Sequence, residues 1–88
     1  MKGQIIPNRI GQIVRVINPL PGEDPMTDYM LAEEPDQNDP NERIMAYKIS
    51  EILRKTAEGV SPIPDYIAKQ ELTVIAENLK SWVESWNE

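Results

Sequence analysis

The sequence predicts one small α+β domain over residues 1–88, made of antiparallel strands with a helix near the C-terminus. Three observations lead to this fold class. A β-branched run lies at residues 10–18, proline-rich loops separate short apolar segments, and apolar side chains recur at helical spacing after residue 76. A chain of 88 residues can build one hydrophobic core of modest size, and we therefore expect a single domain.

The first strand is predicted within residues 10–18, Ile-Gly-Gln-Ile-Val-Arg-Val-Ile-Asn. Valine and isoleucine favour an extended backbone, and apolar side chains on both faces are typical of a strand that is covered on both sides. Pro19 ends this strand because it has no backbone N–H to donate to a sheet. The run 18–25 contains three prolines and Gly22, so it predicts a stiff loop.

A second strand is predicted over residues 28–34, Asp-Tyr-Met-Leu-Ala-Glu-Glu. Alternation places Tyr29, Leu31 and Glu33 on one of its faces. Pro35 ends the strand, and the polar run 36–39 predicts a loop.

The second half of the chain has two interpretations. In the helical one, Asp39 caps a helix that starts at Pro40 and stops before Gly59. A second long helix over 65–87 follows from helical spacing of Leu72, Ile75, Ala76, Leu79, Trp82, Val83 and Trp86. The fold would then be an N-terminal β-hairpin packed on a C-terminal α-hairpin.

In the other interpretation, residues 43–49 and 72–75 are strands. Met45, Tyr47 and Ile49 alternate along the first of them, and the second is a short β-branched run. We favour this interpretation because an isolated two-stranded hairpin is marginal in water, so the two early strands need further partners.

With these strands, the chain resembles the small SH3-like β-barrels. The opening strand is Gly11-Gln12-Ile13-Val14-Arg15-Val16, followed by Tyr29-Met30-Leu31-Ala32-Glu33 and Arg43-Ile44-Met45-Ala46. In those barrels a closing strand follows a tight turn, which matches Tyr66-Ile67-Ala68, Lys69-Gln70-Glu71 and Leu72-Thr73-Val74-Ile75. The resemblance implies an antiparallel SH3-like barrel over about residues 9–76, with residues 77–86 as an appended helix. It implies no particular family or function.

The composition excludes much of enzyme chemistry. Without histidine or cysteine, the chain has neither the commonest general base, nor a thiolate nucleophile, nor the usual zinc ligands. Its serines occur in no Gly-x-Ser-x-Gly motif, and its glycines form no phosphate-binding loop. We therefore expect no catalytic residue, no cofactor and no bound metal.

The charge and the apolar segments set expectations for partners and compartment. A net charge of −6 repels phosphate backbones, so we expect no nucleic-acid binding. No segment approaches the roughly 20 apolar residues of a membrane span, and the N-terminal residues lack the apolar run of a secretory signal. The absence of cysteine agrees with a reducing compartment, and the sequence predicts a cytoplasmic protein that does not bind membranes.

Acidic residues are concentrated in residues 23–42, which hold eight carboxylates and no base. Such oxygens suit calcium, but residues 36–42 lack the glycine and the ligand spacing of an EF-hand loop. The segment is interpreted as a solvated acidic loop that keeps the protein soluble, and the alternative is a surface that attracts a basic protein partner. Its candidate residues are Glu33, Glu34, Asp36 and Asp39.

Trp82 and Trp86 stand one helical turn apart and form a second candidate interaction surface. Tryptophan is enriched where proteins bind one another, so the pair could anchor a partner or a second copy of the chain. The favoured role is nevertheless structural, because a domain without phenylalanine needs large side chains to cover its core.

These observations do not determine a specific function. The first hypothesis is a non-catalytic protein-interaction or accessory domain, whose partner is another protein or a second copy. The alternative is an acidic mimic that occupies the nucleic-acid site of a basic protein. An enzyme that uses only carboxylates is the least favoured, because it needs two carboxyl groups with separated pKa values in a cleft.

Overall fold

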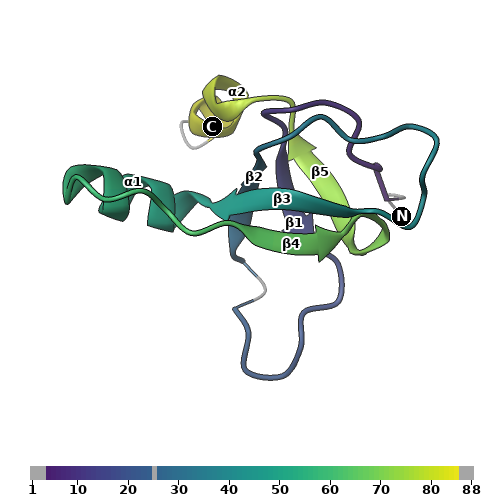
Figure 1. Ribbon diagram of the computed structural model, residues 1–88, viewed down its shortest axis with the longest axis horizontal. Coiled ribbons are helices and arrows are strands. Elements are labelled where there is room, and N and C mark those ends of the chain that lie inside the picture. The colour runs from purple at the N-terminus through teal and green to yellow at the C-terminus, as the bar shows by residue number, and fades with distance from the viewer. Residues whose placement is uncertain (1–3, 25, 86–88) are drawn as a thin grey trace.

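The computed structural model describes residues 4–24 and 26–85. It contains five strands, two α-helices and a short 3-10 helix, and Figure 1 shows their arrangement. The strands are β1 (Ile13–Val16), β2 (Asp28–Leu31), β3 (Arg43–Lys48), β4 (Asp65–Ala68) and β5 (Leu72–Ala76). The helices are α1 (Ile49–Ala57), the 3-10 helix η1 (Lys69–Glu71) and α2 (Leu79–Glu84).

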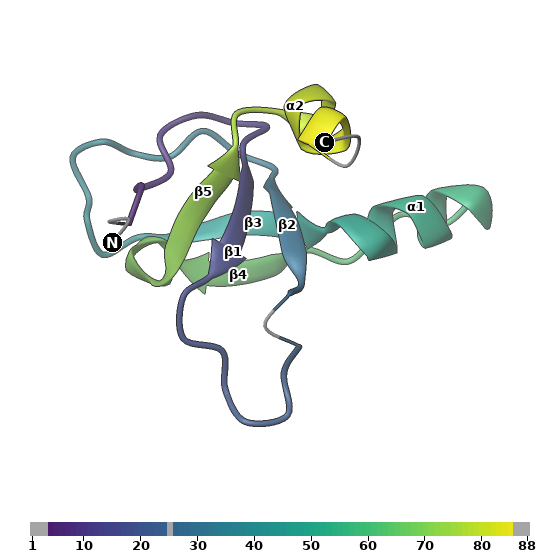
Figure 2. The same ribbon diagram turned by 180° about the vertical axis from the view of Figure 1, so that it is seen from behind.

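All five strands pair antiparallel in one sheet with the order β4-β3-β2-β1-β5. The sheet bends strongly, so that β3 and β4 cross the direction of β1, β2 and β5 (Figures 1 and 2). The α+β class is therefore confirmed. Closure into an SH3-like barrel is not, because β4 and β5 stand at opposite edges of the sheet and the described pairing leaves it open. We call the segment between β1 and β2 the loop 17–27, and its described residues, 17–24 and 26–27, project beyond the strands.

The core forms on one face of the bent sheet. Its buried side chains alternate along the strands as a period of two requires, and Val16 and Ile67 pack against them. These buried residues are Val14, Tyr29, Leu31, Ile44, Ala46, Leu72 and Val74. The sequence predicts that the run 10–18 is covered on both sides, and Ile13 and Val14, on opposite faces of β1, are both buried. Between these two residues the register of the β1–β5 pairing shifts, as it does at a β-bulge.

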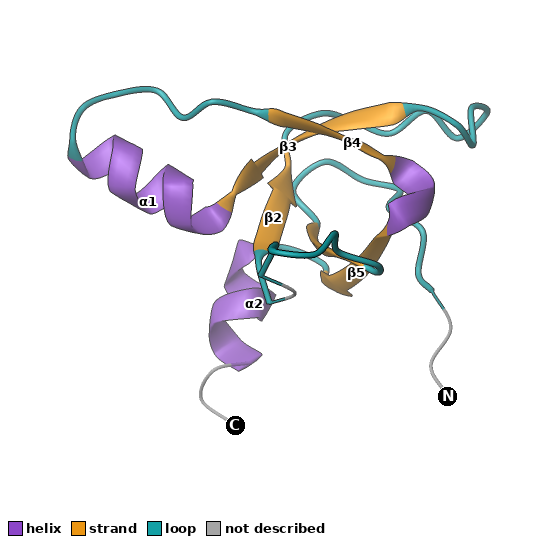
Figure 3. Ribbon diagram, turned by 90° about the horizontal axis from the view of Figure 1, so that it is seen from below, coloured by secondary structure: helices purple, strands orange, loops and turns teal. Residues whose placement is uncertain are grey.

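The interpretation with two hairpins is wrong, because residues 43–48 form β3 between β2 and β4. Ile44 and Ala46 are fully buried there, and pairing on both sides outweighs the local helix signal at Asp39 and Pro40. A helix does follow, but it starts at Ile49 and projects from the sheet (Figure 3). It ends as predicted before Gly59, whose φ of +74° suits the glycine at a helix C-terminus.

The strand, tight turn and strand predicted for residues 66–75 are confirmed. Strand β4, the tight 3-10 turn η1 and strand β5 follow one another, and β5 pairs with β1. The single long helix over 65–87 is thus wrong, while the appended helix exists as α2. Asn78 caps α2 by accepting a hydrogen bond from the Ser81 N–H at 2.8 Å.

The two edges of the sheet differ. Beside β5, the chain at Gln4 and Ile5 runs along the edge, where the Val74 N–H donates to the Ile5 carbonyl at 2.9 Å. Beside β4, Pro62 and Pro64 precede the strand, and prolines at an edge hinder pairing with another chain.

Within the described residues, neither α-helix has the length and apolar character needed to cross a bilayer.

Candidate functional site

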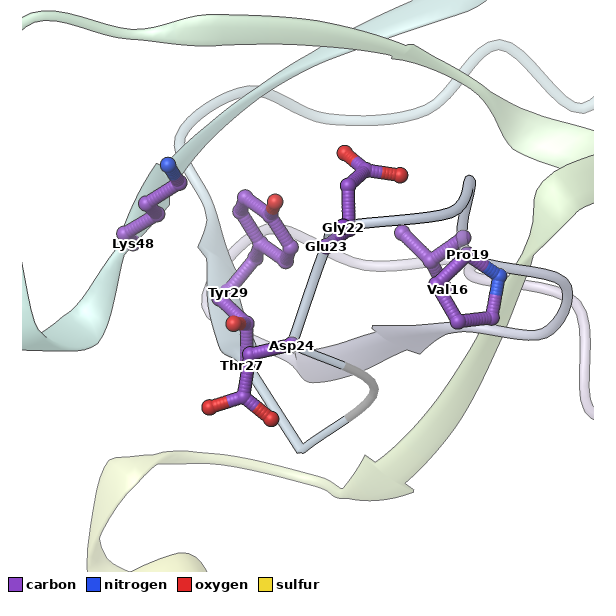
Figure 4. Close-up of a pocket in the computed structure, with 8 residues that line it drawn as sticks. All are labelled: Val16, Pro19, Gly22, Glu23, Asp24, Thr27, Tyr29 and Lys48. Carbon is purple, nitrogen blue, oxygen red and sulfur yellow. The ribbon is translucent and has the colours of Figure 1, made fainter.

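Two hollows meet at Tyr29, between the loop 17–27 and the strands β3 and β4. One measures about 310 Å³ and the other about 330 Å³, and both are lined by Val16, Glu23 and Tyr29. We call this joint surface the Tyr29 groove. The first hollow, shown in Figure 4, is also lined by Pro19, Gly22, Asp24, Thr27 and Lys48. The second is also lined by Asn18, Leu20, Arg43, Asp65, Tyr66, Ile67 and Glu71.

The loop that forms one wall of the groove holds its own conformation. Leu20 and Glu23 exchange two hydrogen bonds, from the Glu23 N–H to the Leu20 carbonyl at 3.0 Å and from the Leu20 N–H to Glu23 Oε1 at 2.7 Å. Gly22 lies inside this turn with φ +91°, a conformation that other residues rarely adopt. The turn therefore fixes the Glu23 carboxylate at the groove, where Figure 4 shows it beside Tyr29.

Tyr29 joins the core to the groove. Its ring packs in the core and the residue is only 7% exposed. Its hydroxyl makes no hydrogen bond to another described residue. The oxygen is not sealed from solvent, since no fully buried polar side-chain atom among the described residues lacks a partner. A buried tyrosine usually finds a partner for its O–H, so this donor remains for a ligand or water in the groove.

The groove is acidic. Its lining contains the carboxylates of Glu23, Asp24, Asp65 and Glu71 and only two bases, Arg43 and Lys48. One base is partly engaged, because Arg43 Nη1 donates to the Tyr66 carbonyl at 3.3 Å. Burial raises the pKa of the Tyr29 hydroxyl, and the negative charges of Asp65 and Glu23 raise this pKa further. The hydroxyl thus faces carboxylates from both the loop and β4.

A pH dependence of stability follows from this raised pKa. An unfolded tyrosine ionises near pH 10 and the folded Tyr29 at higher pH. The contribution of Tyr29 to the free energy of unfolding is therefore complete below pH 10. It is lost as the pH rises from there through the pKa of Tyr29 in the folded protein. We expect Tyr29→Phe to remove this part of the alkaline decline in the free energy of unfolding, measured by urea denaturation between pH 8 and about pH 11.5.

At pH 7 the same Tyr29→Phe substitution should change the free energy of unfolding by less than about 0.5 kcal/mol, since the ring stays and no hydrogen bond to a described residue is lost. A loss above about 1 kcal/mol at pH 7, a typical value for a hydrogen bond, would show that the hydroxyl has a partner inside the protein.

Each of the four acids predicted as an interaction surface accepts a hydrogen bond from a backbone N–H. Glu33 and Glu34 accept hydrogen bonds from the Met45 N–H at 2.9 Å and the Ile10 N–H at 3.0 Å. Asp36 and Asp39 each accept from the N–H two residues further along, at 2.9 and 3.0 Å. None of these four residues lines the Tyr29 groove. The structure assigns them contacts that shape the loop between β2 and β3.

The same loop is anchored by a buried lysine. Lys69, at the start of η1, is 5% exposed, and its Nζ lies 2.9 Å from Glu42 Oε1 and 2.6 Å from the Asp36 carbonyl oxygen. Glu42 Oε1 also accepts from the Asp36 N–H at 2.6 Å. This ion pair therefore ties the acidic loop to the sheet.

Trp82 lies in α2 and is half-buried. Its indole N–H donates to Asp28 Oδ2 at 2.8 Å, and Asp28 Oδ1 accepts from Arg15 Nε at the same distance. Trp82 also lines a third hollow, of about 290 Å³, with Met26 and Leu53. This hollow shares Asp24 and Thr27 with the first hollow of the Tyr29 groove. Trp86, the other predicted tryptophan, lies outside the described residues.

Among residues 4–24 and 26–85, no three acidic side chains lie close enough together to hold a metal ion. Comparison of the chain with protein-family models, with curated proteins and with solved structures gives no match.

The sequence does not single out Tyr29, Glu23 or Asp65 as site residues. Alternation within residues 28–34 places Tyr29 on a strand face, and Glu23 belongs to the acidic segment. Asp65 is 36 positions after Tyr29, and only the pairing of β4 with β3 brings it to the groove. A buried tyrosine beside a proline-rich loop is the one local signal that could have indicated this site.

Proposed function

We propose that this chain is a non-catalytic protein-interaction domain and that the Tyr29 groove is its binding surface. The observation that supports the proposal most directly is the hydroxyl of the buried Tyr29, which makes no hydrogen bond to another described residue. Binding sites combine apolar walls with a few polar groups that fix the orientation of the ligand. The groove has both, with Val16, Leu20 and Ile67 as apolar lining.

The acidic-mimic alternative has less support. A mimic must present carboxylates in place of phosphates, whereas the acids of residues 33–39 accept hydrogen bonds from the protein's own backbone. The partner in the present proposal is another protein, and the acidic lining gives no surface for nucleic acid or an anionic membrane.

Two finer proposals accompany this function. We propose that the bent sheet is an open form of the SH3-like barrel, supported by the 3-10 turn η1 and by the pairing of the following strand β5 with the opening strand β1. We also propose a cytoplasmic location, supported by the absence of cysteine from the chain.

Site-specific photo-crosslinking tests the proposed function. A benzoylphenylalanine at Leu20, which lines the groove and is 70% exposed, should give a discrete crosslinked product in cells of the source organism. The matched position is Ile75 on β5, which is exposed but does not line the groove. Equal products from both positions, or none from Leu20, would contradict the proposal.

A further inference from the structure

We propose, on the basis of the interaction function above, that the groove binds an extended peptide segment through one arginine or lysine side chain. The cation lies among the carboxylates of Glu23 and Asp65, and a main-chain carbonyl of the same segment accepts a hydrogen bond from the Tyr29 hydroxyl. The proposal thereby names the chemical class of the partner.

The first argument is the mismatch between the groove's donors and acceptors. The protein supplies a phenolic donor, Tyr29, and two carboxylate acceptors, Glu23 and Asp65, whose charges act on it. The Tyr29 hydroxyl nevertheless makes no hydrogen bond to either carboxylate. A ligand that satisfies both kinds of group must itself carry an acceptor and a cationic donor. A peptide residue with a basic side chain has both, the acceptor at its main-chain carbonyl and the cationic donor at the end of its side chain.

The second argument is charge. Four carboxylates and two bases line the groove, and no basic side chain of the described residues forms a salt bridge with Glu23 or Asp65. Glu23 is held by the turn at Leu20, so its position is set before a ligand arrives. Preorganised carboxylates favour a guanidinium or ammonium group, because binding then costs little rearrangement of the protein.

The third argument is the shape of the lining. The two hollows share Tyr29 as a lining residue and form two halves of one surface, the first reaching Lys48 and Pro19 and the second reaching Ile67 and Asp65. Within the first, Tyr29 lies between Lys48 and Pro19 (Figure 4). Apolar side chains occur in both halves. An isolated cation would leave this apolar lining exposed to water, whereas an extended segment covers it with its own side chains.

NMR titration of the full chain with small probes tests the inference. The probe is N-acetyl-arginine N-methylamide, which contains the guanidinium and the flanking carbonyls. The matched neutral probe is N-acetyl-citrulline N-methylamide, which replaces the guanidinium by a urea group. n-Butylguanidine is the third probe and keeps the guanidinium, with the same single positive charge, without the carbonyls.

We expect the arginine probe to shift the amide signals of Glu23, Tyr29 and Asp65 with a dissociation constant in the millimolar range, and citrulline to bind at least about tenfold more weakly. n-Butylguanidine should bind about fivefold more weakly than the arginine probe. Tyr29→Phe should weaken binding of the arginine probe by a similar factor and leave binding of n-butylguanidine unchanged.

Charge-neutral variants provide the second measurement. Glu23→Gln with Asp65→Asn should weaken the arginine probe at least about tenfold and leave citrulline unaffected. The control is Glu84→Gln, an exposed acid on α2 outside the groove, which should have no effect. Circular dichroism confirms that each variant is folded.

The outcomes separate this inference from the proposed function. If citrulline and arginine bind the groove equally, the cation is not recognised and the inference fails, although the groove remains a binding surface. If no probe shifts the groove while the Leu20 crosslink yields a partner, the inference fails alone. If neither experiment gives a signal, both fail.

Discussion

Replacing Lys69 with methionine is expected to lower the free energy of unfolding by about 3 kcal/mol, the largest effect of any single polar substitution in this chain. Lys69 is buried, and its loss removes the bonds of Nζ to Glu42 and to the Asp36 carbonyl. Glu42, mostly buried, would keep its charge without this cation. Because small domains are stable by only about 5–15 kcal/mol, urea denaturation should show the change clearly.

A double variant provides the control for this ion pair. Lys69→Met combined with Glu42→Gln removes both charges but keeps a side-chain oxygen for the Asp36 N–H. It should lose less stability than Lys69→Met alone, by about 1 kcal/mol or more, because no unpaired buried charge remains. If Lys69→Met alone changed the free energy of unfolding by less than about 0.5 kcal/mol, this result would contradict the assigned role of Lys69.

The second large effect is expected at Asp28, whose carboxylate joins β2 to both β1 and α2. Asp28→Ala should cost about 2 kcal/mol, because the Arg15 guanidinium and the Trp82 indole N–H both lose their bond to it. The Asp28 side chain is only 11% exposed, so water replaces these bonds incompletely. Urea denaturation measures the loss, and the indole N–H signal of Trp82 should shift in the NMR spectrum.

Trp82→Phe tests the hydrogen bond between the Trp82 indole and Asp28 while the bond between Arg15 and Asp28 stays in place. It keeps an aromatic ring on α2 but removes the indole N–H together with part of the ring, so we expect a smaller cost of about 1 kcal/mol. If Asp28→Ala costs no more than Trp82→Phe, then the Arg15 bond contributes nothing to stability. The account of Asp28 as a link among three elements would then be wrong.

The strands were predictable from sequence where local pattern and tertiary pairing agree. Residues 10–18 and 28–34 contain β1 and β2, because β-branched and alternating side chains there suit a half-buried sheet. Residues 40–57 gave an ambiguous pattern for a physical reason. They contain both a strand and a helix, joined without a break at Lys48 and Ile49, and the helix has no side-chain cap to mark its start.

The site was less predictable than the fold. Acidic residues between 33 and 39 form a cluster in the sequence, and each of the four accepts a hydrogen bond from a backbone N–H. Asp36 and Asp39 accept from residues two positions further along, whereas Glu33 and Glu34 accept from the distant Met45 and Ile10. The groove, in contrast, assembles residues from the loop 17–27, β2 and β4, which are far apart in the chain. Nor does sequence show that the Tyr29 hydroxyl lacks a partner, because that depends on where every nearby donor and acceptor lies.

Both proposals depend on a Tyr29 hydroxyl that opens on the groove, makes no hydrogen bond to another described residue, and lies near enough to Glu23 and Asp65 for their charges to act on it. The most direct test is a spectrophotometric titration at 295 nm of the Tyr47→Phe, Tyr66→Phe variant, in which Tyr29 is the sole tyrosine. We predict a Tyr29 pKa above its ordinary value of about 10, lowered when Glu23→Gln and Asp65→Asn are added. A pKa at or below about 10, or one that those two substitutions leave unchanged, would contradict the geometry of the groove.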